Sequence, residues 1–414
     1  MTSRIASLTL AAATGLAALP THADPAFRFE DVTATHLPET VLRNSMDVGV
    51  ADLDGDGDLD VIIPQEFRLN KLLLNGGDGR FVDASARVPA LTAEELAGGP
   101  PQLQFPGAGH DSEDVSIGDF DGDGVLDAVM VAEDDVKFGR TQVHEYLRGL
   151  GDGRFERVRP GLPDMEADAV AHADLDGDGD LDLLVAGAGQ DRLLVNDGRG
   201  AFTDDTAARL PPEDGVTQDV EIADLDRDRD LDVVLGQEGG HALWLNDGSG
   251  RFTDASDRLP DPGSVEARKV TPGDVDGDGD LDLYFSHVGW QGRAPQDHLL
   301  INDGSGRFTN ETARRIPAET ATTLTARFAD LDGDGDLDLV RGEDGPLTVW
   351  TNDGAGVFTD VSAAVLANGV QGTNIAIALA DFDGDGRIDI YVGQLKAGRP
   401  DETLRDRLLL NRPD

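Results

Sequence analysis

The 414-residue sequence contains no cysteine and few aromatic residues, which make up 5% of the chain. Without cysteine the fold cannot be held by disulfides, so an exported protein of this composition needs another cross-link. Basic residues are scarce as well, because 34 lysines and arginines stand against 81 aspartates and glutamates, for a formal net charge of −47. This charge argues against nucleic acid and anionic membranes as partners. The acidic residues recur periodically, which argues against a disordered acidic chain.

Long apolar runs are also missing after the first residues, so we expect no membrane insertion. The start of the chain has the features of a signal peptide: Arg4 is positively charged, residues 5–19 are small and apolar, and Ala23 is a small residue suited to cleavage. We therefore expect cleavage of residues 1–23 near Ala23 and export to the periplasm or beyond. A membrane anchor is the alternative, which the short, alanine-rich stretch disfavours. We expect residues 24–414 to form one monomeric domain.

One nine-residue pattern, D-x-D-x-D-x-x-[LI]-D, occurs seven times and defines seven repeats, whose loops are numbered 1 to 7 in chain order. Positions 1, 3, 5, 7 and 9 are Asp52, Asp54, Asp56, Asp58 and Asp60 in loop 1; Asp119, Asp121, Asp123, Val125 and Asp127 in loop 2; Asp174, Asp176, Asp178, Asp180 and Asp182 in loop 3; Asp224, Asp226, Asp228, Asp230 and Asp232 in loop 4; Asp274, Asp276, Asp278, Asp280 and Asp282 in loop 5; Asp330, Asp332, Asp334, Asp336 and Asp338 in loop 6; and Asp381, Asp383, Asp385, Arg387 and Asp389 in loop 7.

Each repeat contains four short apolar runs, one before the loop and three after it, with an Asp-Gly turn such as residues 247–250 between the last two. Such runs, bounded by glycine and aspartate, are typical of antiparallel strands. Four strands in about fifty residues predict an all-β fold, a seven-bladed β-propeller with four strands per blade. The chain ends on a third strand at residues 408–411 and begins with a fourth at residues 29–33. We expect these strands to pair and close the ring.

Carboxylates at alternate positions of a tight loop converge on one point, and oxygen ligands at this charge density suit calcium. Positions 1, 3, 5 and 9 would provide side-chain oxygens, position 6 is a glycine for the sharp turn, and position 7 would provide its carbonyl oxygen. Solvated turns are the alternative for one copy, but seven copies in register favour metal. We expect up to seven Ca²⁺ ions.

Loop 4 departs from this pattern because Arg227 and Arg229 replace glycines. A residue with a side chain is strained in a left-handed backbone, and Arg227 would bring a positive charge near the site. We expect this loop to bind calcium most weakly.

The loops, as in residues 173–182, and the turn at residues 302–309 resemble the FG-GAP or VCBS repeat family, which includes the calcium-binding propeller of integrin α-subunits. The resemblance covers nearly the whole mature chain and implies that each Asp loop joins the first and second strands of a blade. It implies little about function, since the family includes adhesins, lectin-like modules and accessory domains of enzymes. Fold alone does not assign function.

A ligand could lie on the face opposite the Asp loops, where we single out Arg268, His287 and Trp290 because a tryptophan beside polar residues can stack on a sugar. A core or loop aromatic is the alternative. The insertion at residues 87–110 is a second candidate. The histidines, including His241, show no zinc-binding spacing, and no G-x-S-x-G motif appears. We expect a non-catalytic binding, adhesion or scaffolding module with a protein or glycan partner. A polysaccharide-binding lectin or enzyme and an envelope component are the alternatives.

Overall fold

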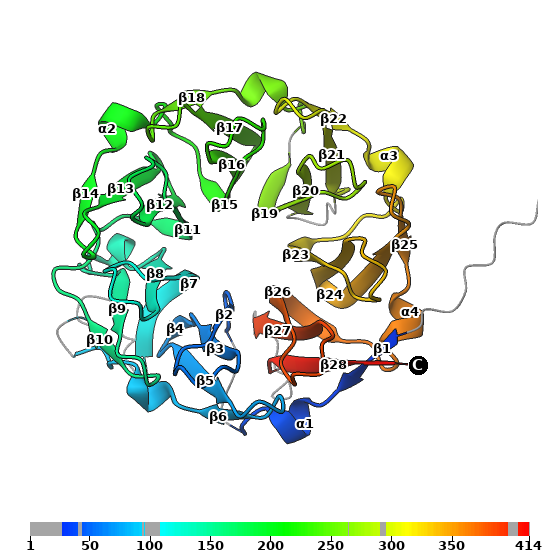
Figure 1. Ribbon diagram of the computed structural model, residues 1–414, viewed down its shortest axis with the longest axis horizontal. Coiled ribbons are helices and arrows are strands. Elements are labelled where there is room, and N and C mark those ends of the chain that lie inside the picture. The colour runs from blue at the N-terminus through cyan, green and yellow to red at the C-terminus, as the bar shows by residue number, and fades with distance from the viewer. Residues whose placement is uncertain are drawn as a thin grey trace, which may run out of the picture.

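The computed structural model describes residues 27–39, 44–92, 95, 108–263, 265–289, 295–395 and 405–413. The predicted signal peptide, Trp290 and most of the predicted insertion lie outside these residues. The described chain forms six antiparallel sheets around a common centre, with the first strand of each repeat innermost and the last on the outer rim (Figure 1). The prediction of an all-β fold made of four-strand antiparallel groups is confirmed.

Four of the sheets have four strands each. They are formed by β2 (Gly49–Ala51), β3 (Asp60–Ile63), β5 (Lys71–Asn75) and β6 (Phe81–Asp83); by β11 (Ala167–Ala173), β12 (Asp182–Gly187), β13 (Arg192–Asn196) and β14 (Phe202–Asp204); by β15 (Thr217–Ala223), β16 (Asp232–Gln237), β17 (Gly240–Asn246) and β18 (Phe252–Asp254); and by β19 (Glu266–Gly273), β20 (Asp282–Val288), β21 (His298–Asn302) and β22 (Phe308–Asn310).

The other two sheets are larger. The five-stranded sheet contains β4 (Glu66–Arg68), β7 (Ala108–Gly118), β8 (Asp127–Ala132), β9 (Glu145–Gly149) and β10 (Phe155–Arg157), and the seven-stranded sheet contains β23 (Thr323–Ala329), β24 (Asp338–Asn352), β25 (Phe358–Asp360), β26 (Gln371–Ala380), β27 (Asp389–Leu395), β28 (Arg407–Pro413) and β1 (Phe27–Asp31). The long strand β24 pairs with β23, β25 and β26, which joins the sixth and seventh repeats in one sheet.

Short helical turns follow most of the outermost strands on the rim (Figure 1). These turns are α1 (Thr33–His36), α2 (Thr206–Arg209), α3 (Thr312–Arg315), α4 (Ser362–Val365) and the 3₁₀ turns η1 (Ser85–Arg87) and η4 (Ser256–Arg258), with a further 3₁₀ turn η3 (Val136–Phe138) between β8 and β9. Among the described residues, no helix has the length and apolar character needed to cross a membrane.

The two ends of the chain meet in one sheet. Strand β1 pairs antiparallel with β28, with Phe29 opposite Asn411, and the Val32 N–H donates to the Leu408 carbonyl at 3.0 Å. The first strand of the chain therefore supplies the fourth strand of the last repeat, as the sequence predicts.

Apolar side chains are buried between neighbouring repeats. Leu184 of the third repeat and Trp244 of the fourth belong to one such cluster. Val61 of the first repeat and Tyr391 of the seventh belong to another, so the first and last repeats pack against each other like any other neighbours. Burial of this apolar area is the main source of stability for the contacts between repeats.

An asparagine at the end of the third strand connects neighbouring repeats through the Asp loops. The Asn246 Nδ2 donates to the Leu231 carbonyl of its own loop at 3.1 Å and to the Leu175 carbonyl of the preceding loop at 2.9 Å. The same pair of bonds is made by Asn75, Asn196, Asn302, Asn352 and Asn411. For Asn75 the preceding loop is loop 7, because its Nδ2 donates to the Phe382 carbonyl at 2.8 Å.

Candidate metal loops and ligand pockets

Each Asp loop lies between the first and second strands of its repeat. Loop 3 joins β11 to β12 and loop 4 joins β15 to β16, and the other five occupy the same place. The asparagine bonds between successive loops, and the bond from the Gly153 N–H to the Leu53 carbonyl of loop 1, place the seven loops at one end of the ring. This is the position that the family resemblance implies.

Within a loop, the aspartate at position 1 holds the turn. In loop 3 the Asp174 carboxylate accepts hydrogen bonds from the N–H groups of Gly177 at 2.8 Å and Gly179 at 3.1 Å. Both glycines have positive φ, +78° and +97°, a backbone conformation that L-residues with side chains adopt at a cost. The glycines therefore let the loop turn tightly enough to bring alternate carboxylates together.

The aspartate at position 9 is buried and ties the loop to the sheet. The Asp182 carboxylate accepts the Leu175 N–H at 3.2 Å and the Asn196 N–H at 2.9 Å. Burial raises its pKa to about 6. Sequence reasoning assigns this residue to a metal shell, and the structure adds that it satisfies the backbone N–H groups of two segments. Burial raises the pKa in the same way to about 6 at Asp60 and Asp127 and to about 7 at Asp232, Asp282, Asp338 and Asp389.

The aspartate at position 3 has a carboxylate oxygen without a hydrogen-bond partner in four of the loops. Its Oδ1 atom is buried and has no hydrogen-bond partner at Asp54, Asp176, Asp226 and Asp276. In loop 3, one carboxylate oxygen from each of Asp174, Asp176 and Asp178 lies within 4.8 Å of the other two. Crowded carboxylates of this kind repel one another unless a cation lies between them. The candidate ligand atoms are all oxygens, so the residues present fit a hard cation such as Ca²⁺.

Arginines of the rim turns form ion pairs with position-3 aspartates. Arg209 lies with Nη2 3.1 Å from Asp176 Oδ2, and its Nη1 donates to the Ser249 carbonyl of the next repeat at 2.6 Å. Arg258 and Arg315 make the equivalent contacts in the two following repeats. Sequence reasoning missed these ion pairs, although an arginine recurs shortly after the fourth strand. Each guanidinium joins one Asp loop to the neighbouring repeat.

Loop 4 keeps the loop conformation despite its arginines. Arg227 and Arg229 have φ values of +64° and +81°, so both are held in the left-handed region that glycine occupies elsewhere. The expectation that Arg227 would place its charge near its own site is wrong. Its guanidinium pairs with the Asp280 carboxylate and donates to the Asp278 carbonyl at 3.3 Å, both in loop 5, because the side chain extends toward the next repeat.

At the other end of the first strands, the same β-bulge recurs in six repeats. A bulge inserts one residue and turns its side chain in a new direction. The inserted residues are Glu113, Asp168, Gln218, Arg268, Leu324 and Ile375, and they meet around a central hollow of about 30 Å³. Arg268, one of the residues predicted for the ligand face, lies at this end with Nη2 3.6 Å from Glu113 Oε2.

Beneath these residues the centre is filled with paired charges. Lys269 Nζ lies 2.6 Å from Asp219 Oδ1, and Asp219 Oδ2 accepts the Val270 N–H at 2.8 Å. Burial raises the pKa of Asp114 well above its usual range and that of Glu221 to about 7, so these carboxyls can stay protonated near neutrality. An adjoining hollow of about 240 Å³ is lined by polar residues such as Glu221 and Lys269. Its volume is below the range of usual ligand pockets.

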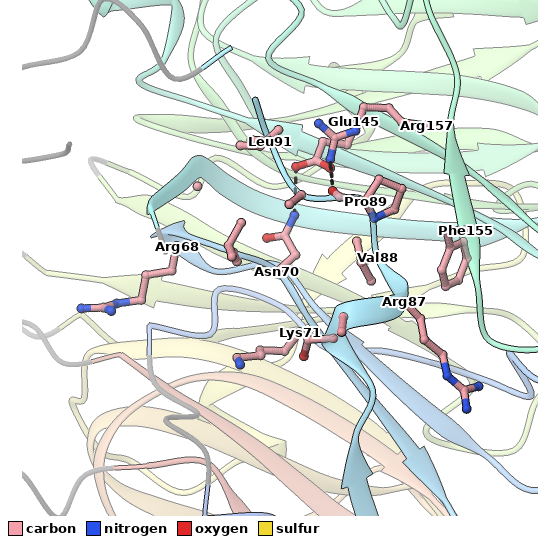
Figure 2. Close-up of a pocket in the computed structure, with 15 residues that line it drawn as sticks. Arg68, Asn70, Lys71, Arg87, Val88, Pro89, Leu91, Glu145, Phe155 and Arg157 are labelled. Atoms are coloured by element: carbon pink, nitrogen blue, oxygen red, sulfur yellow. Dashed lines mark hydrogen bonds and ion pairs between the residues drawn. The ribbon is translucent and has the colours of Figure 1, made fainter. Parts of the chain in front are cut away.

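A larger pocket of about 590 Å³ lies between the first and second repeats (Figure 2). Figure 2 shows Asn70, Glu145 and Arg157 pointing toward one another next to Pro89. Arg157 Nη2 donates to Glu145 Oε2 at 2.5 Å and to the Pro89 carbonyl at 2.6 Å, and Asn70 Nδ2 donates to Glu145 Oε1 at 3.3 Å. The described start of the predicted insertion, residues 87–91, forms one wall. The volume of the pocket is within the range of small-molecule sites.

The other two residues predicted for the ligand face, His287 and Trp290, give no evidence for a ligand site there. His287 is fully buried, beside His241 and His298, rather than exposed. Trp290 lies outside the described residues.

Several solved structures share this fold. An Agrocybe aegerita lectin, described as specifically recognising non-reducing terminal N-acetylglucosamine, is 19% identical with a TM-score of 0.50, covering 79% of this chain and 84% of the lectin chain. BBS1N, in complex with ARL6DN in a lead-soaked crystal, is 10% identical with a TM-score of 0.55, covering 95% of this chain and 98% of its own. At these identities the likeness concerns the fold alone. No curated protein sequence matches this chain.

A family model supports the repeat directly. The model of the FG-GAP-like repeat matches residues 174–235, 224–285, 288–341 and 330–392, which together span half of the chain. These matches contain Asp loops 3 to 7 and the strands around them. The chain therefore belongs to the FG-GAP-like repeat family.

Proposed function

We propose that this protein is an exported, calcium-stabilised propeller that acts as a non-catalytic binding module. The observation that carries the proposal is the buried, unpartnered Oδ1 atom at position 3 of four Asp loops, next to other carboxylates. A buried polar atom without a partner is costly, and one repeated in register points to an absent ligand rather than to chance.

We further propose that the strands make a closed ring of seven four-stranded blades. Three contacts support closure: the pairing of β1 with β28, the cluster shared by Val61 and Tyr391, and the hydrogen bond from Asn75 to the Phe382 carbonyl. Each of these joins the first and last repeats by a contact of the same kind as those inside the chain. The pairing of β1 with β28 also covers the edge that β28 would otherwise expose.

In each loop, calcium would be held by carboxylate oxygens at positions 1, 3, 5 and 9 and by the backbone carbonyl at position 7. The bound ion would supply positive charge that relieves repulsion among these carboxylates. It would thereby take the structural part that disulfides have in other exported proteins. Among the loops, we expect loop 4 to bind most weakly, because Arg229 is held at a φ of +81°.

The first experiment is thermal unfolding of the full chain with excess calcium, after metal removal, and after calcium is restored. A ligand that binds only the folded state raises its melting temperature, so we expect a reversible rise with calcium and six or seven ions per chain by mass spectrometry. No rise and no bound metal would refute the calcium proposal. Mass analysis of the exported protein tests removal of residues 1–23.

Glycan binding is a second candidate, favoured by the pocket between the first and second repeats. This pocket combines planar polar groups on Asn70, Glu145 and Arg157 with the apolar Leu69 at its rim, and a lectin shares the fold. Leu69 is 38% exposed, and Leu150, elsewhere on the surface, is 46% exposed. If glycans bind here, Leu69→Asp should reduce glycan-array signals while Leu150→Asp leaves them unchanged. Equal signals for the two variants would place the ligand elsewhere.

A further inference from the structure

Three histidines from two neighbouring repeats converge at the end of the ring opposite the Asp loops. His241 is the second residue of β17, the third strand of the fourth repeat, just after the connection from β16. His287 lies near the end of β20 and His298 begins β21, both in the fifth repeat. One ring nitrogen from each histidine lies within 4.8 Å of the other two.

The geometry of the first two rings suits a shared ion. The Nε2 atoms of His241 and His287 lie 3.4 Å apart. Two nitrogens bound at about 2.0–2.1 Å to one tetrahedral Zn²⁺ would lie about 3.3–3.4 Å apart. For a direct hydrogen bond the same distance is long, since N–H donors usually lie about 2.7–3.2 Å from their acceptors.

The tautomer of His287 is fixed by its other nitrogen. His287 Nδ1 lies 3.1 Å from the Gln296 carbonyl oxygen, which can only accept, so Nδ1 carries the hydrogen and donates it. In the neutral ring Nε2 then carries the lone pair, and it lies 3.4 Å from His241 Nε2. An Nδ1–H bonded to a backbone carbonyl is the usual outer contact that orients a metal-bound histidine.

The surroundings favour neutral, well-oriented rings. Phe285 stacks on His241 with ring centres 3.8 Å apart, and His287 packs against His298 with ring centres 4.6 Å apart. His241 and His287 are buried, while His298 is partly exposed, so an ion has access from its side. Burial lowers the pKa of His241 to about 3 and that of His287 to about 4, which keeps both in the form that binds metals.

We propose that His241, His287 and His298 form a binding site for a divalent transition-metal ion, with Zn²⁺ as the best fit, separate from the Asp loops. Imidazole nitrogen is a good ligand for zinc, copper and nickel, and a poor one for calcium, which takes oxygen. Three protein ligands leave a fourth coordination position for water or for an atom of a bound ligand. The site goes beyond the proposed calcium-stabilised function and does not depend on it.

The test is zinc binding to the full chain in the presence of excess calcium, which keeps zinc from the carboxylate loops. We expect one tightly bound zinc per wild-type chain by mass spectrometry after dialysis. His298→Gln, which alters the partly exposed ligand, should weaken zinc binding at least about tenfold. His36→Gln is the matched control, because His36 is also partly buried but lies outside the cluster. Equal zinc affinity in wild type and His298→Gln would overturn the proposal.

Cobalt substitution gives a second measurement on the unmodified protein. Co²⁺ bound by three imidazoles in a tetrahedral site should give intense visible absorption bands, and added zinc should abolish them. Weak bands of octahedral cobalt that zinc does not change would show instead that the three rings only stack and hydrogen-bond in the core. This spectrum decides the question even if His298→Gln fails to fold.

Discussion

Loop 4 offers a direct test of how the glycine positions control the metal loops. Arg229 has a φ of +81°, and its exposed side chain stands where the other six loops have glycine. A residue with a side chain costs about 1–2 kcal/mol in this conformation, while glycine costs about 0.5–1 kcal/mol more than alanine in lost chain entropy. We therefore expect Arg229→Gly to stabilise the metal-free protein by about 0.5–1 kcal/mol.

The same change should have a larger effect when calcium is present. The variant removes a positive charge close to the loop and relaxes the backbone whose N–H donates to Asp224 Oδ2 at 3.2 Å. If loop 4 then fills at a calcium concentration 100 times its dissociation constant, binding adds about 2.7 kcal/mol to the folded state. The gain in unfolding free energy from Arg229→Gly should therefore be several times larger with calcium than without it.

The assay is urea unfolding with and without calcium, together with ion counting by mass spectrometry. The matched reverse variant is Gly179→Arg in loop 3, since a Cβ there meets no atom within 4 Å and only the φ of +97° opposes it. At a calcium concentration that leaves only loop 4 of the wild type empty, we expect Arg229→Gly to bind one more ion than the wild type and Gly179→Arg to bind one fewer. The reasoning is refuted if both variants keep the wild-type ion count and the same calcium-dependent stability.

Three further predictions concern contacts inside the ring. Asn75→Ala should cost about 1–3 kcal/mol of unfolding free energy, because the buried Phe382 carbonyl loses its donor, whereas Asn368→Ala, at an exposed position, should cost far less; equal losses would argue against ring closure through Asn75. Asp182→Asn should destabilise even the metal-free protein by about 1–3 kcal/mol, because its amide N–H₂ would face the N–H of either Leu175 or Asn196. The control is Asp178→Asn in the metal-free protein, since Asp178 is exposed. Calcium affinity measured by titration calorimetry should rise between about pH 5 and 7.5 and then level off, because burial raises the pKa of the position-9 carboxyls to about 6–7 and the ion needs them ionised. In the metal-free protein their contribution to stability is present below about pH 4 and is lost as pH rises from about 4 to 7. An affinity that stays constant from about pH 5 to 7.5 would exclude position 9 from the metal shell.

Features encoded within one repeat could be predicted from the sequence. The Asp loop, the glycines that turn it and the four strands are local patterns, and the meeting of β1 with β28 follows from counting strands at the two ends. Position 9 was only partly understood, because its hydrogen bond to the third strand, as between Asp182 and Asn196, depends on how the strands pair.

Features that depend on two repeats escaped prediction. His241 and His298 lie in different repeats, and no linear spacing shows that they meet. Arg227 illustrates the same limit, since its sequence position suggests its own loop while the ring geometry directs it to Asp280 of the next. The pocket lined by Pro89 likewise takes Asn70 from one repeat and Glu145 from another. Contacts between repeats are set by the distance between sheets, which a single repeat does not encode.

The two ends of the ring differ in how far the repeats agree with one another. At position 9 of the loops all seven repeats carry the same aspartate, because the backbone N–H groups of every loop need the same acceptor. At the bulge of the first strand the inserted residue is acidic in two repeats, and in the other four it is glutamine, arginine, leucine and isoleucine, as Gln218 and Arg268 illustrate. A ring of equivalent repeats can recognise an asymmetric partner only through positions that differ. The bulge end, with the pocket and the histidine cluster on the same side, is therefore where we expect selectivity to reside, while the loop end, with the same position-9 aspartate in every repeat, is where we expect a structural role.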